Sequence, residues 1–401
     1  MSVVIIGAGA AGIFAAITIK ALNPLLEVLV LEKTRKPLAK VKISGGGRCN
    51  VTHFCFDPAK LILNYPRGSK ELLGPFHRFG PKDTVNWFES HGVPLKTEKD
   101  GRMFPTTDSS QTIIDCLLHE IDRLGVVLKT ETNVTNVEKT AQGYRIHIDN
   151  APTIDCEKLV IATGSSRLVF TWLAHLGHTI APPVPSLFTF NIESFCLKEL
   201  SGISVNQATV KILDTNLSQT GPLLITHWGF SGPAVLKLSA WGARILHDRD
   251  YKANIQISWL SGYTEQTLLE KIRNTKITHA KRLCANECPF ELPSSLWKAL
   301  LLRSGITERW ADISKKQELA LISHLLHDHF TINGQTTNKE EFVTCGGISL
   351  DEIQFKSMQS KLAANLFFAG EVLNIDGVTG GFNFQNAWTT GYIAGSYIAT
   401  T

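Results

Sequence analysis

The segment from Val3 to Gly12 constrains the fold of this chain more strongly than any other stretch. Four apolar residues, Val3–Ile6, predict a buried parallel strand. Three glycines follow at the spacing G-x-G-x-x-G, namely Gly7, Gly9 and Gly12. At a strand-to-helix turn, the first glycine permits a tight turn, the second lets backbone approach a pyrophosphate, and the third lets the helix pack on the sheet. Because a helix N-terminus also attracts phosphate, the segment predicts a dinucleotide-binding βαβ unit.

A second predicted strand places an acid where such a unit requires one. Pro24 ends the helix, Val28–Leu31 is another buried apolar run, and Glu32 follows it. A carboxylate at this position accepts hydrogen bonds from ribose hydroxyls. The mostly apolar residues 3–19 could alternatively form a short membrane span or a signal sequence. The glycine spacing, the second strand and the acid favour nucleotide binding, and we expect no membrane association.

Composition sets broader limits on the kind of protein. With 401 residues, 43% of them apolar and 19% charged, the chain is long enough for two or three globular domains. A net charge of +4 without a polybasic block permits an anionic partner such as RNA but does not argue for one. Eight scattered cysteines indicate a reducing cytoplasm. Cys284 and Cys288 form the closest pair, and because no second pair follows at zinc-like spacing, we expect no metal site.

A second glycine-rich segment, Ser44–Asn50, follows Glu32. Its three consecutive glycines would cost conformational entropy in a helix or strand. They make sense where backbone passes close to a flat or anionic ligand. Arg48, directly after them, can offer a planar and permanently charged donor group to a phosphate or an anionic ring. The alternative interpretation is a flexible surface loop.

Two later segments have the same character. Residues 158–164 predict a buried strand that ends in a small glycine-containing turn, and residues 366–371 predict another that ends in Gly-Glu. Gly380 and Gly381 then precede an apolar helix. The positive end of that helix would stabilise negative charge on a nearby ring.

The fingerprint with Glu32 and Lys33, followed by residues 42–50, resembles the bacterial HI0933-like flavoproteins. Residues 221–236 and 344–395 resemble the same family. The resemblance covers nearly the whole chain. It implies an α/β fold with a Rossmann-like FAD-binding domain of the two-dinucleotide-binding-domain type. A β-rich domain and a helical subdomain would be inserted in it. The expected parts are FAD domain 1–185 and 346–401, β-rich domain 186–262 and 331–345, and helical subdomain 263–330.

The resemblance also implies which residues hold FAD. The ADP half would contact Gly7, Gly9, Ala10, Ala11, Gly12, Glu32, Lys33 and Lys40, and Val134 would contact adenine through its backbone. The rest of the cofactor would lie near Ser44, Gly45, Gly46, Gly47, Arg48, Cys49 and Asn50. The remaining expected contacts are Ala162, Thr163, Gly164, Gly370, Glu371, Asp376, Gly380, Gly381, Phe382 and Asn383.

By resemblance, the chain is expected to be a cytoplasmic FAD-dependent oxidoreductase that reduces an activated C=C bond. Uridine in ribosomal RNA, reduced to dihydrouridine, is the first candidate substrate. Because no second G-x-G-x-x-G is present, NADPH or NADH is expected to visit the flavin transiently. Candidate proton donors are Cys49, His227 and Cys345. The alternatives are a reductase or oxidase of a small molecule (a steroid-like alkene or an amine), and a flavin-bound RNA-binding protein without turnover.

Overall fold

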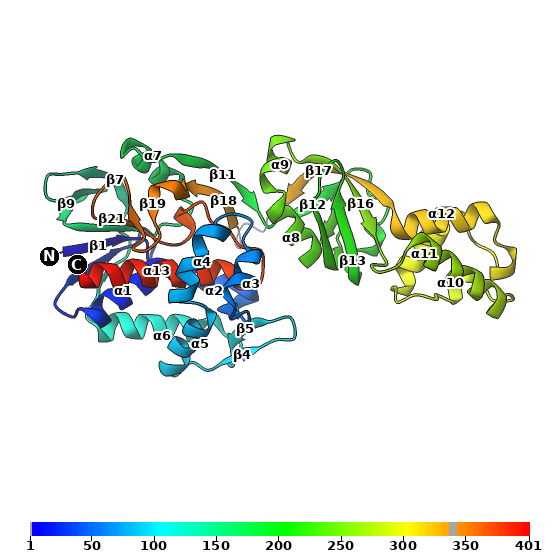
Figure 1. Ribbon diagram of the computed structural model, residues 1–401, viewed down its shortest axis with the longest axis horizontal. Helices are drawn as coiled ribbons and strands as arrows, with labels where there is room; N and C mark the ends of the chain where they lie inside the picture. The colour runs from blue at the N-terminus through cyan, green and yellow to red at the C-terminus, as the bar shows by residue number, and fades with distance from the viewer. Residues whose placement is uncertain (1, 337–342) are drawn as a thin grey trace. The chain divides into compact units, whose positions relative to one another are not determined.

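The computed structural model describes residues 2–336 and 343–401 (Figure 1). It divides into two compact units. Unit 1 comprises Met1–Val184 and Lys339–Thr401, and unit 2 comprises Pro185–Asn338. Unit 2 is therefore an insertion in the sequence of unit 1. No helix among the described residues is both long and apolar enough to cross a membrane.

Unit 1 is built on a seven-stranded sheet. The strand order is β19-β20-β21-β10-β1-β2-β6, which brings strands from both ends of the chain together. The five strands from β21 to β6 are parallel. They comprise β1 (Ser2–Ile6), β2 (Glu27–Leu31), β6 (Val127–Lys129), β10 (Lys158–Ile161) and β21 (Leu366–Phe368). The antiparallel edge is formed by β19 (Ile353–Gln354) and β20 (Gln359–Ser360).

Two helices from opposite ends of the chain, α1 (Ala10–Leu22) and α13 (Phe382–Thr400), pack against each other in unit 1 (Figure 1). Glycines of α13 make this approach possible. A Cβ atom at Gly391 would lie 2.6 Å from the carbonyl oxygen of Ala11, and one at Gly395 would lie 2.8 Å from that of Ala15. Because both positions lack a side chain, the end of the chain is held beside the first helix.

The other elements of unit 1 surround this framework. A small antiparallel sheet has the order β3-β5-β4, and a second one has the order β7-β8-β9. Their strands are β3 (Thr52–His53), β4 (Leu95–Thr97), β5 (Arg102–Pro105), β7 (Val134–Lys139), β8 (Tyr144–Ile148) and β9 (Ala151–Cys156). The helices are α2 (Ala39–Gly47), α3 (Pro58–Leu61), α4 (Ser69–Arg78), α5 (Pro81–Ser90), α6 (Ser110–Arg123) and α7 (Arg167–His175). Strands β11 (Ile180–Ser186) and β18 (Val343–Ile348) pair where the chain leaves and re-enters the unit.

Unit 2 contains a closed barrel with the strand order β12-β15-β14-β13-β16-β17. Its strands are β12 (Thr189–Ile192), β13 (Ser204–Ile212), β14 (Ser218–Ile225), β15 (Gly229–Ser231), β16 (Lys252–Ser258) and β17 (Asp328–Thr336). Helices α8 (Pro233–Trp241) and α9 (Ala243–Asp248) follow β15. Between β16 and β17 the chain forms α10 (Glu265–Thr278), α11 (Ser294–Arg303) and α12 (Lys315–Leu326), which gather at one end of the barrel (Figure 1).

The barrel and the three helices share one apolar core, in which Phe230, Trp259, Trp297 and Trp310 are buried. The expected α/β architecture with inserted β-rich and helical parts is therefore confirmed. The expected boundary at residue 345 lies within β18 and stays a prediction. The finer boundaries at residues 262 and 330 stay predictions, and residues 337–342 lie outside the described part of the chain.

Candidate cofactor site

The turn between β1 and α1 needs its three glycines for two different reasons. A Cβ at Gly7, whose φ is +107°, would lie 2.4 Å from the Ala162 carbonyl oxygen. A Cβ at Gly12 would lie 2.0 Å from the Gly7 carbonyl oxygen. At Gly9, by contrast, an added Cβ would meet no atom of the described residues within 4 Å. Gly7 and Gly12 therefore permit close packing, whereas Gly9 presents its backbone to open space at the start of α1, as pyrophosphate binding requires.

Glu32 is fixed at the end of β2 by three donors. One carboxylate oxygen accepts a hydrogen bond from the Ala8 backbone N–H (2.9 Å). The other accepts from the Thr34 N–H (2.9 Å) and hydroxyl (2.7 Å). The Thr132 N–H donates to the Glu32 carbonyl oxygen at 2.9 Å. This bond places the residues that precede Val134, the first residue of β7, beside the turn. Glu32 and the chain entering β7 are thus brought together, and Lys33 follows on the same turn.

Glu371 connects three distant segments at the other side of the glycine turn. Its carboxylate pairs with the Lys40 ammonium at 2.6 Å and accepts a hydrogen bond from the Thr344 N–H at 3.0 Å. A Cβ at Gly164 would lie 3.5 Å from the same carboxylate. Gly370 lies close to Ala11 at the start of α1. The loop after β10, the start of α2 and the end of β21 therefore meet here.

The triple-glycine segment lies at the end of α2. Gly45, Gly46 and Gly47 have φ values of +58°, +69° and +83°, a left-handed backbone that L residues rarely adopt. Ser44 and Gly45 break the helical geometry. A Cβ at Gly46 or Gly47 would meet no atom within 4 Å in the part of the chain that the structure describes, so packing against these residues does not require glycine there. Open space beside exposed backbone fits a bound ligand.

Arg48 is anchored by groups that the sequence did not connect to it. Its guanidinium donates to Glu98 at 2.7 Å, lies 3.5 Å from the Asp108 carboxylate, and stacks 4.0 Å from the centre of the Phe104 ring. The hydrogen bond to Glu98 raises the pKa of Arg48 above its ordinary value. In this structure Arg48 fixes the glycine loop against β5. Its predicted contact with the cofactor stays a prediction.

The glycine loop is joined to the start of α13 through Asn50. In the orientation that satisfies both ends of its amide, Asn50 donates to the Thr52 carbonyl oxygen (3.0 Å) and accepts from the Gly381 N–H (2.9 Å). Gly380 and Gly381 have φ values of +134° and +91°. A Cβ at Gly381 would lie 2.5 Å from the Thr52 carbonyl oxygen. The two glycine runs predicted to touch the flavin therefore lie side by side in unit 1.

Three of the predicted contacts near α13 have partners within the protein. Asp376 is fully buried and ion-paired with Arg67. The Asn383 amide accepts from the Gly377 N–H (2.8 Å) and donates to its carbonyl oxygen (2.9 Å). The Phe382 carbonyl oxygen accepts from the Tyr65 hydroxyl at 2.6 Å. These contacts fix the turn before α13, and direct cofactor contacts from the three residues stay predictions.

The comparisons with known proteins agree with this geometry. The family model described as the HI0933-like protein Rossmann domain matches residues 1–397. The chain belongs to this HI0933-like family. It is 31% identical to a ribosomal RNA dihydrouridine synthase of Escherichia coli (strain K12), covering 97% of this chain and 96% of that protein. It is 25% identical to a 3-dehydro-bile acid delta(4,6)-reductase of Clostridium scindens, covering 98% and 97%.

Solved structures show the fold of this HI0933-like protein. A 3-ketosteroid-delta4-(5alpha)-dehydrogenase from Rhodococcus jostii RHA1 matches with a TM-score of 0.53 and 14% identity, over 100% of this chain and 96% of that one. A flavocytochrome c3 fumarate reductase matches with a TM-score of 0.52 and 16% identity, over 100% and 78%. The predicted Rossmann-like FAD-binding fold is confirmed. As a member of the family that its model and its curated relatives show, the chain is an FAD-dependent oxidoreductase. FAD binding fits the open backbone at Gly9, Gly46 and Gly47.

The three predicted proton donors of this HI0933-like protein lie in different surroundings. Cys49 is fully buried next to Asn50, and burial raises the pKa of its thiol to about 12. Cys345 is buried in β18, beside the Thr344 N–H that binds Glu371. His227 is exposed in the turn between β14 and β15 of unit 2. Cys49 and Cys345 belong to the unit that carries the glycine runs, and the role of all three as acids stays a prediction.

One polar residue beside the two glycine runs was missed by the sequence reasoning. The His53 ring stacks on the Phe382 ring, with centroids 4.8 Å apart and planes inclined by 21°. A Cβ at Gly380 would lie 3.5 Å from the His53 ring. The signal that could have found it is its position three residues after Asn50, at the end of a motif already linked to the cofactor.

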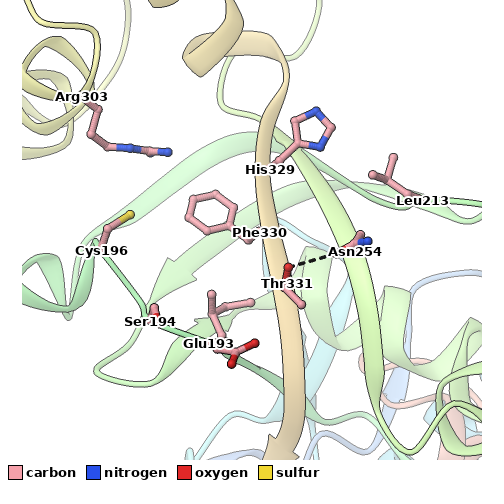
Figure 2. Close-up of a pocket in the computed structure, with 10 residues that line it drawn as sticks. Glu193, Ser194, Cys196, Leu213, Asn254, Arg303, His329, Phe330 and Thr331 are labelled. Atoms are coloured by element: carbon pink, nitrogen blue, oxygen red, sulfur yellow. Dashed lines mark hydrogen bonds between the residues drawn. The ribbon is translucent and has the colours of Figure 1, made fainter.

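Unit 2 contains a separate polar cleft of about 460 Å³ between β17 of the barrel and the end of α11 (Figure 2). Arg303 extends over Phe330, and both of its terminal nitrogens donate to Asp328, at 2.7 and 2.6 Å. Asp328 also accepts from the Trp259 indole at 3.0 Å. Because the charge of Arg303 is already paired, the cleft offers no strong anion site. None of the predicted cofactor or acid residues lines it.

Proposed function

We propose that this protein uses FAD to reduce an activated C=C bond, with NADPH or NADH as the electron donor. The observation that carries the proposal is the hydrogen bond that the Asn50 amide accepts from the Gly381 N–H. It joins Gly45–Gly47 to Gly380–Gly381, two runs with positive φ, beside the open backbone of Gly46 and Gly47. Flavin supplies the hydride chemistry when it is bound. The names of two relatives, a dihydrouridine synthase and a delta(4,6)-reductase, both concern C=C bonds.

The residues of the chain would bind and tune the cofactor. The Gly9 backbone and the start of α1 would hold the pyrophosphate, and Glu32 would hold the adenosine ribose. Glu371, placed by Lys40 and the Thr344 N–H, would hold the ribitol. The positive end of α13, a helix of 19 residues, would stabilise negative charge on the ring system.

We propose uridine in ribosomal RNA as the substrate. The support is the 31% identity to the Escherichia coli synthase and the 30% identity to the Haemophilus influenzae synthase, each over 97% of this chain. A ribosomal RNA substrate would place the protein in the cytoplasm. The bile acid reductase, at 25% identity, supports a steroid-like alkene as the second candidate.

The nicotinamide donor is proposed to bind transiently. The sequence has one G-x-G-x-x-G fingerprint, at Gly7–Gly12, and that site is assigned to FAD. A nicotinamide that visits the flavin face needs no dedicated dinucleotide fold. The same flavin face can then serve the donor and the substrate in turn.

The test is anaerobic reduction of the purified yellow protein by NADPH or NADH, followed by reoxidation with candidate acceptors. We expect one nucleotide to bleach the flavin and unmodified ribosomal RNA to restore its colour. Absence of bleaching by both nucleotides would refute the proposed donor. Reoxidation by a steroid-like enone but not by RNA would select the second substrate. Equal dihydrouridine content of ribosomal RNA in cells with and without the gene would remove the RNA substrate.

A further inference from the structure

We propose that unit 2 binds single-stranded RNA on one outer face of its barrel, with one base in the polar cleft beside that face. This inference rests on the proposed function, in which RNA is the substrate. It adds a site for nucleotides other than the uridine that is reduced. The outward-pointing side chains of β13, β16 and β17, three neighbouring strands, form this surface, which we call the barrel face.

Strand pairing places the side chains of the barrel face on the same side of the sheet. Asn254 of β16 is directly opposite Thr331 of β17, and Gln256 of β16 is directly opposite Lys211 of β13. Residues opposite each other in antiparallel strands point to the same side, and so do alternate residues along one strand. Ile255, which lies between the two β16 residues, is buried in the barrel core. The four polar side chains therefore point outward.

The barrel face carries amide, hydroxyl and basic side chains and lacks exposed acids. The sequences of β13, β16 and β17 contain one Asp and no Glu, and that residue, Asp328, is buried and paired with Arg303. Lys211 and Lys252 are exposed, and neither has an ion-pair partner among the described residues. Unpaired ammonium groups on a surface without carboxylates attract the phosphates of a nucleic acid.

The two lysines lie on opposite sides of the row that leads to the cleft. Lys252 is two positions before Asn254 on β16, and Lys211 is opposite Gln256, two positions after it. The row of Asn254 and Thr331 runs between them, and both of these residues line the cleft. An RNA strand that contacts both ammonium groups therefore passes the opening of the cleft.

The cleft offers hydrogen-bonding groups that suit a base better than a phosphate (Figure 2). The Thr331 hydroxyl donates to the Asn254 amide oxygen at 3.0 Å, and the amide N–H groups have no partner among the described residues. The Glu193 N–H donates to the Thr331 carbonyl oxygen at 3.1 Å, which places the exposed Glu193 carboxylate at the cleft. A carboxylate repels phosphate but accepts from the N–H groups of a base.

The size and the remaining lining of the cleft also fit a base. Its volume of about 460 Å³ is within the range of small-ligand sites. Leu213 and Phe330 line it, and Arg303 extends over the Phe330 ring. Apolar and guanidinium surfaces contact the flat face of a base. Because Asp328 already pairs with Arg303, contacts to phosphate are left to the lysines of the barrel face.

The first experiment measures binding of a fluorescein-labelled single-stranded RNA to the full-length, FAD-loaded protein. No nicotinamide donor is added, so no turnover occurs. The test protein carries Lys211→Gln and Lys252→Gln together. The matched control carries Lys271→Gln and Lys298→Gln, which change exposed lysines of α10 and α11. Fluorescence anisotropy at several salt concentrations gives the slope of the logarithm of the binding constant against the logarithm of the salt concentration.

Each phosphate contact to a single strand contributes about 0.7 to the magnitude of this slope. We therefore expect the magnitude to fall by about 1.4 in the barrel-face variant and to stay at the wild-type value in the control. Equal slopes for the barrel-face variant and the wild type would overturn the inference. An equal decrease in both double variants would also overturn it, because the attraction would then be spread over the whole of unit 2.

The cleft is tested by Asn254→Ala, with Asn274→Ala, an exposed asparagine of α10, as its control. We expect Asn254→Ala to bind the same RNA roughly 10-fold more weakly, with an unchanged salt slope, because a contact to a base releases no counterion. Asn274→Ala should bind as the wild type does. Wild-type affinity of Asn254→Ala would overturn the assignment of a base to the cleft.

A second measurement uses the unaltered protein and does not depend on a variant folding. RNA that contains 4-thiouridine is cross-linked by light to the FAD-loaded protein, and the cross-linked peptides are identified by mass spectrometry. We expect peptides from residues 252–258 or 328–336 among them. Cross-links confined to unit 1 would overturn the inference and leave the proposed function intact. Failure of the wild-type protein to bind RNA, with its reduced flavin still reoxidised by a steroid-like enone, would overturn both the inference and the RNA substrate.

Discussion

The Lys40 ammonium and the Glu371 carboxylate lie 2.6 Å apart, although 331 positions separate them in the sequence. This ion pair joins the start of α2 to the end of β21. The Thr344 N–H, from β18, also donates a hydrogen bond to this carboxylate, so a third element meets there. Chain segments on both sides of the inserted unit 2 therefore build one acidic position in unit 1.

We expect Glu371→Gln to weaken FAD binding by roughly 10- to 100-fold. The neutral amide keeps the shape but loses hydrogen bonds to a charged group, each worth about 1.5–3 kcal/mol. Lys40→Met should weaken FAD binding less than Glu371→Gln does. The Lys40 side chain is 56% exposed, and exposed ion pairs contribute about 0–1 kcal/mol. Titration of the apo-protein with FAD, followed by flavin fluorescence, measures both. Equal affinity of Glu371→Gln and wild type would contradict the ribitol assignment.

Gly9→Val should abolish FAD retention without unfolding the protein. The backbone of Gly9 is extended, at φ −83° and ψ −174°, and an added Cβ meets no atom of residues 2–336 and 343–401 within 4 Å. The new side chain therefore fills only the space assigned to pyrophosphate. Gly12→Val is the matched control and should lower thermal stability, because its Cβ would lie 2.0 Å from the Gly7 carbonyl oxygen. Absorbance spectra of the purified variants measure FAD retention, and thermal unfolding of the apo-proteins measures their stability. A yellow Gly9→Val protein would refute the cofactor assignment.

The glycine turn could be predicted because its constraints are local. Gly7 and Gly12 are five positions apart, and the clash that excludes a side chain at Gly12 involves Gly7 itself. The strand, the helix and Glu32 follow from hydrophobic pattern and spacing alone. The fold class was therefore accessible from the sequence and from its family resemblance.

The partners of the buried and charged side chains could not be predicted in the same way. Arg48 meets Glu98 and Phe104 only because β5 folds back beside the glycine loop. His53 meets Phe382 across more than three hundred residues. No periodicity or motif spacing encodes such contacts, because they depend on how separate elements pack. The position of His53 beside the glycine runs was therefore not predicted.

Asp376→Asn should destabilise unit 1 strongly. Asp376 is fully buried and paired with Arg67, whose side chain is 18% exposed, and removal of the Asp376 charge breaks this largely buried ion pair. Breaking a buried pair typically costs about 3–5 kcal/mol. Asp155→Asn is the matched control, since its pair with Arg145 is 60% and 47% exposed and should contribute less than about 1 kcal/mol. Urea unfolding measures both, and equal midpoints for the two variants would contradict the buried-pair interpretation.

The buried thiols should make the protein sensitive to alkaline pH. Burial raises the pKa of Cys49 and of Cys156 from 9.0 to about 12 in the folded state. A group whose pKa is raised by folding contributes stability that is fully present below its unfolded pKa and is lost as pH rises toward its folded pKa. Between pH 9 and about pH 12 the unfolded chain gives up these protons first, so stability falls.

Replacing a buried thiol by a group that does not titrate should remove part of this loss. We expect the melting temperature of wild-type apo-protein to drop more between pH 8 and pH 10.5 than that of Cys49→Ala. Cys196→Ala, which changes an exposed thiol, should behave as wild type and serves as the control. Thermal unfolding at the two pH values gives the comparison. An identical pH-dependent drop in Cys49→Ala and wild type would show that ionisation of Cys49 is not coupled to unfolding and would contradict the raised pKa of this thiol.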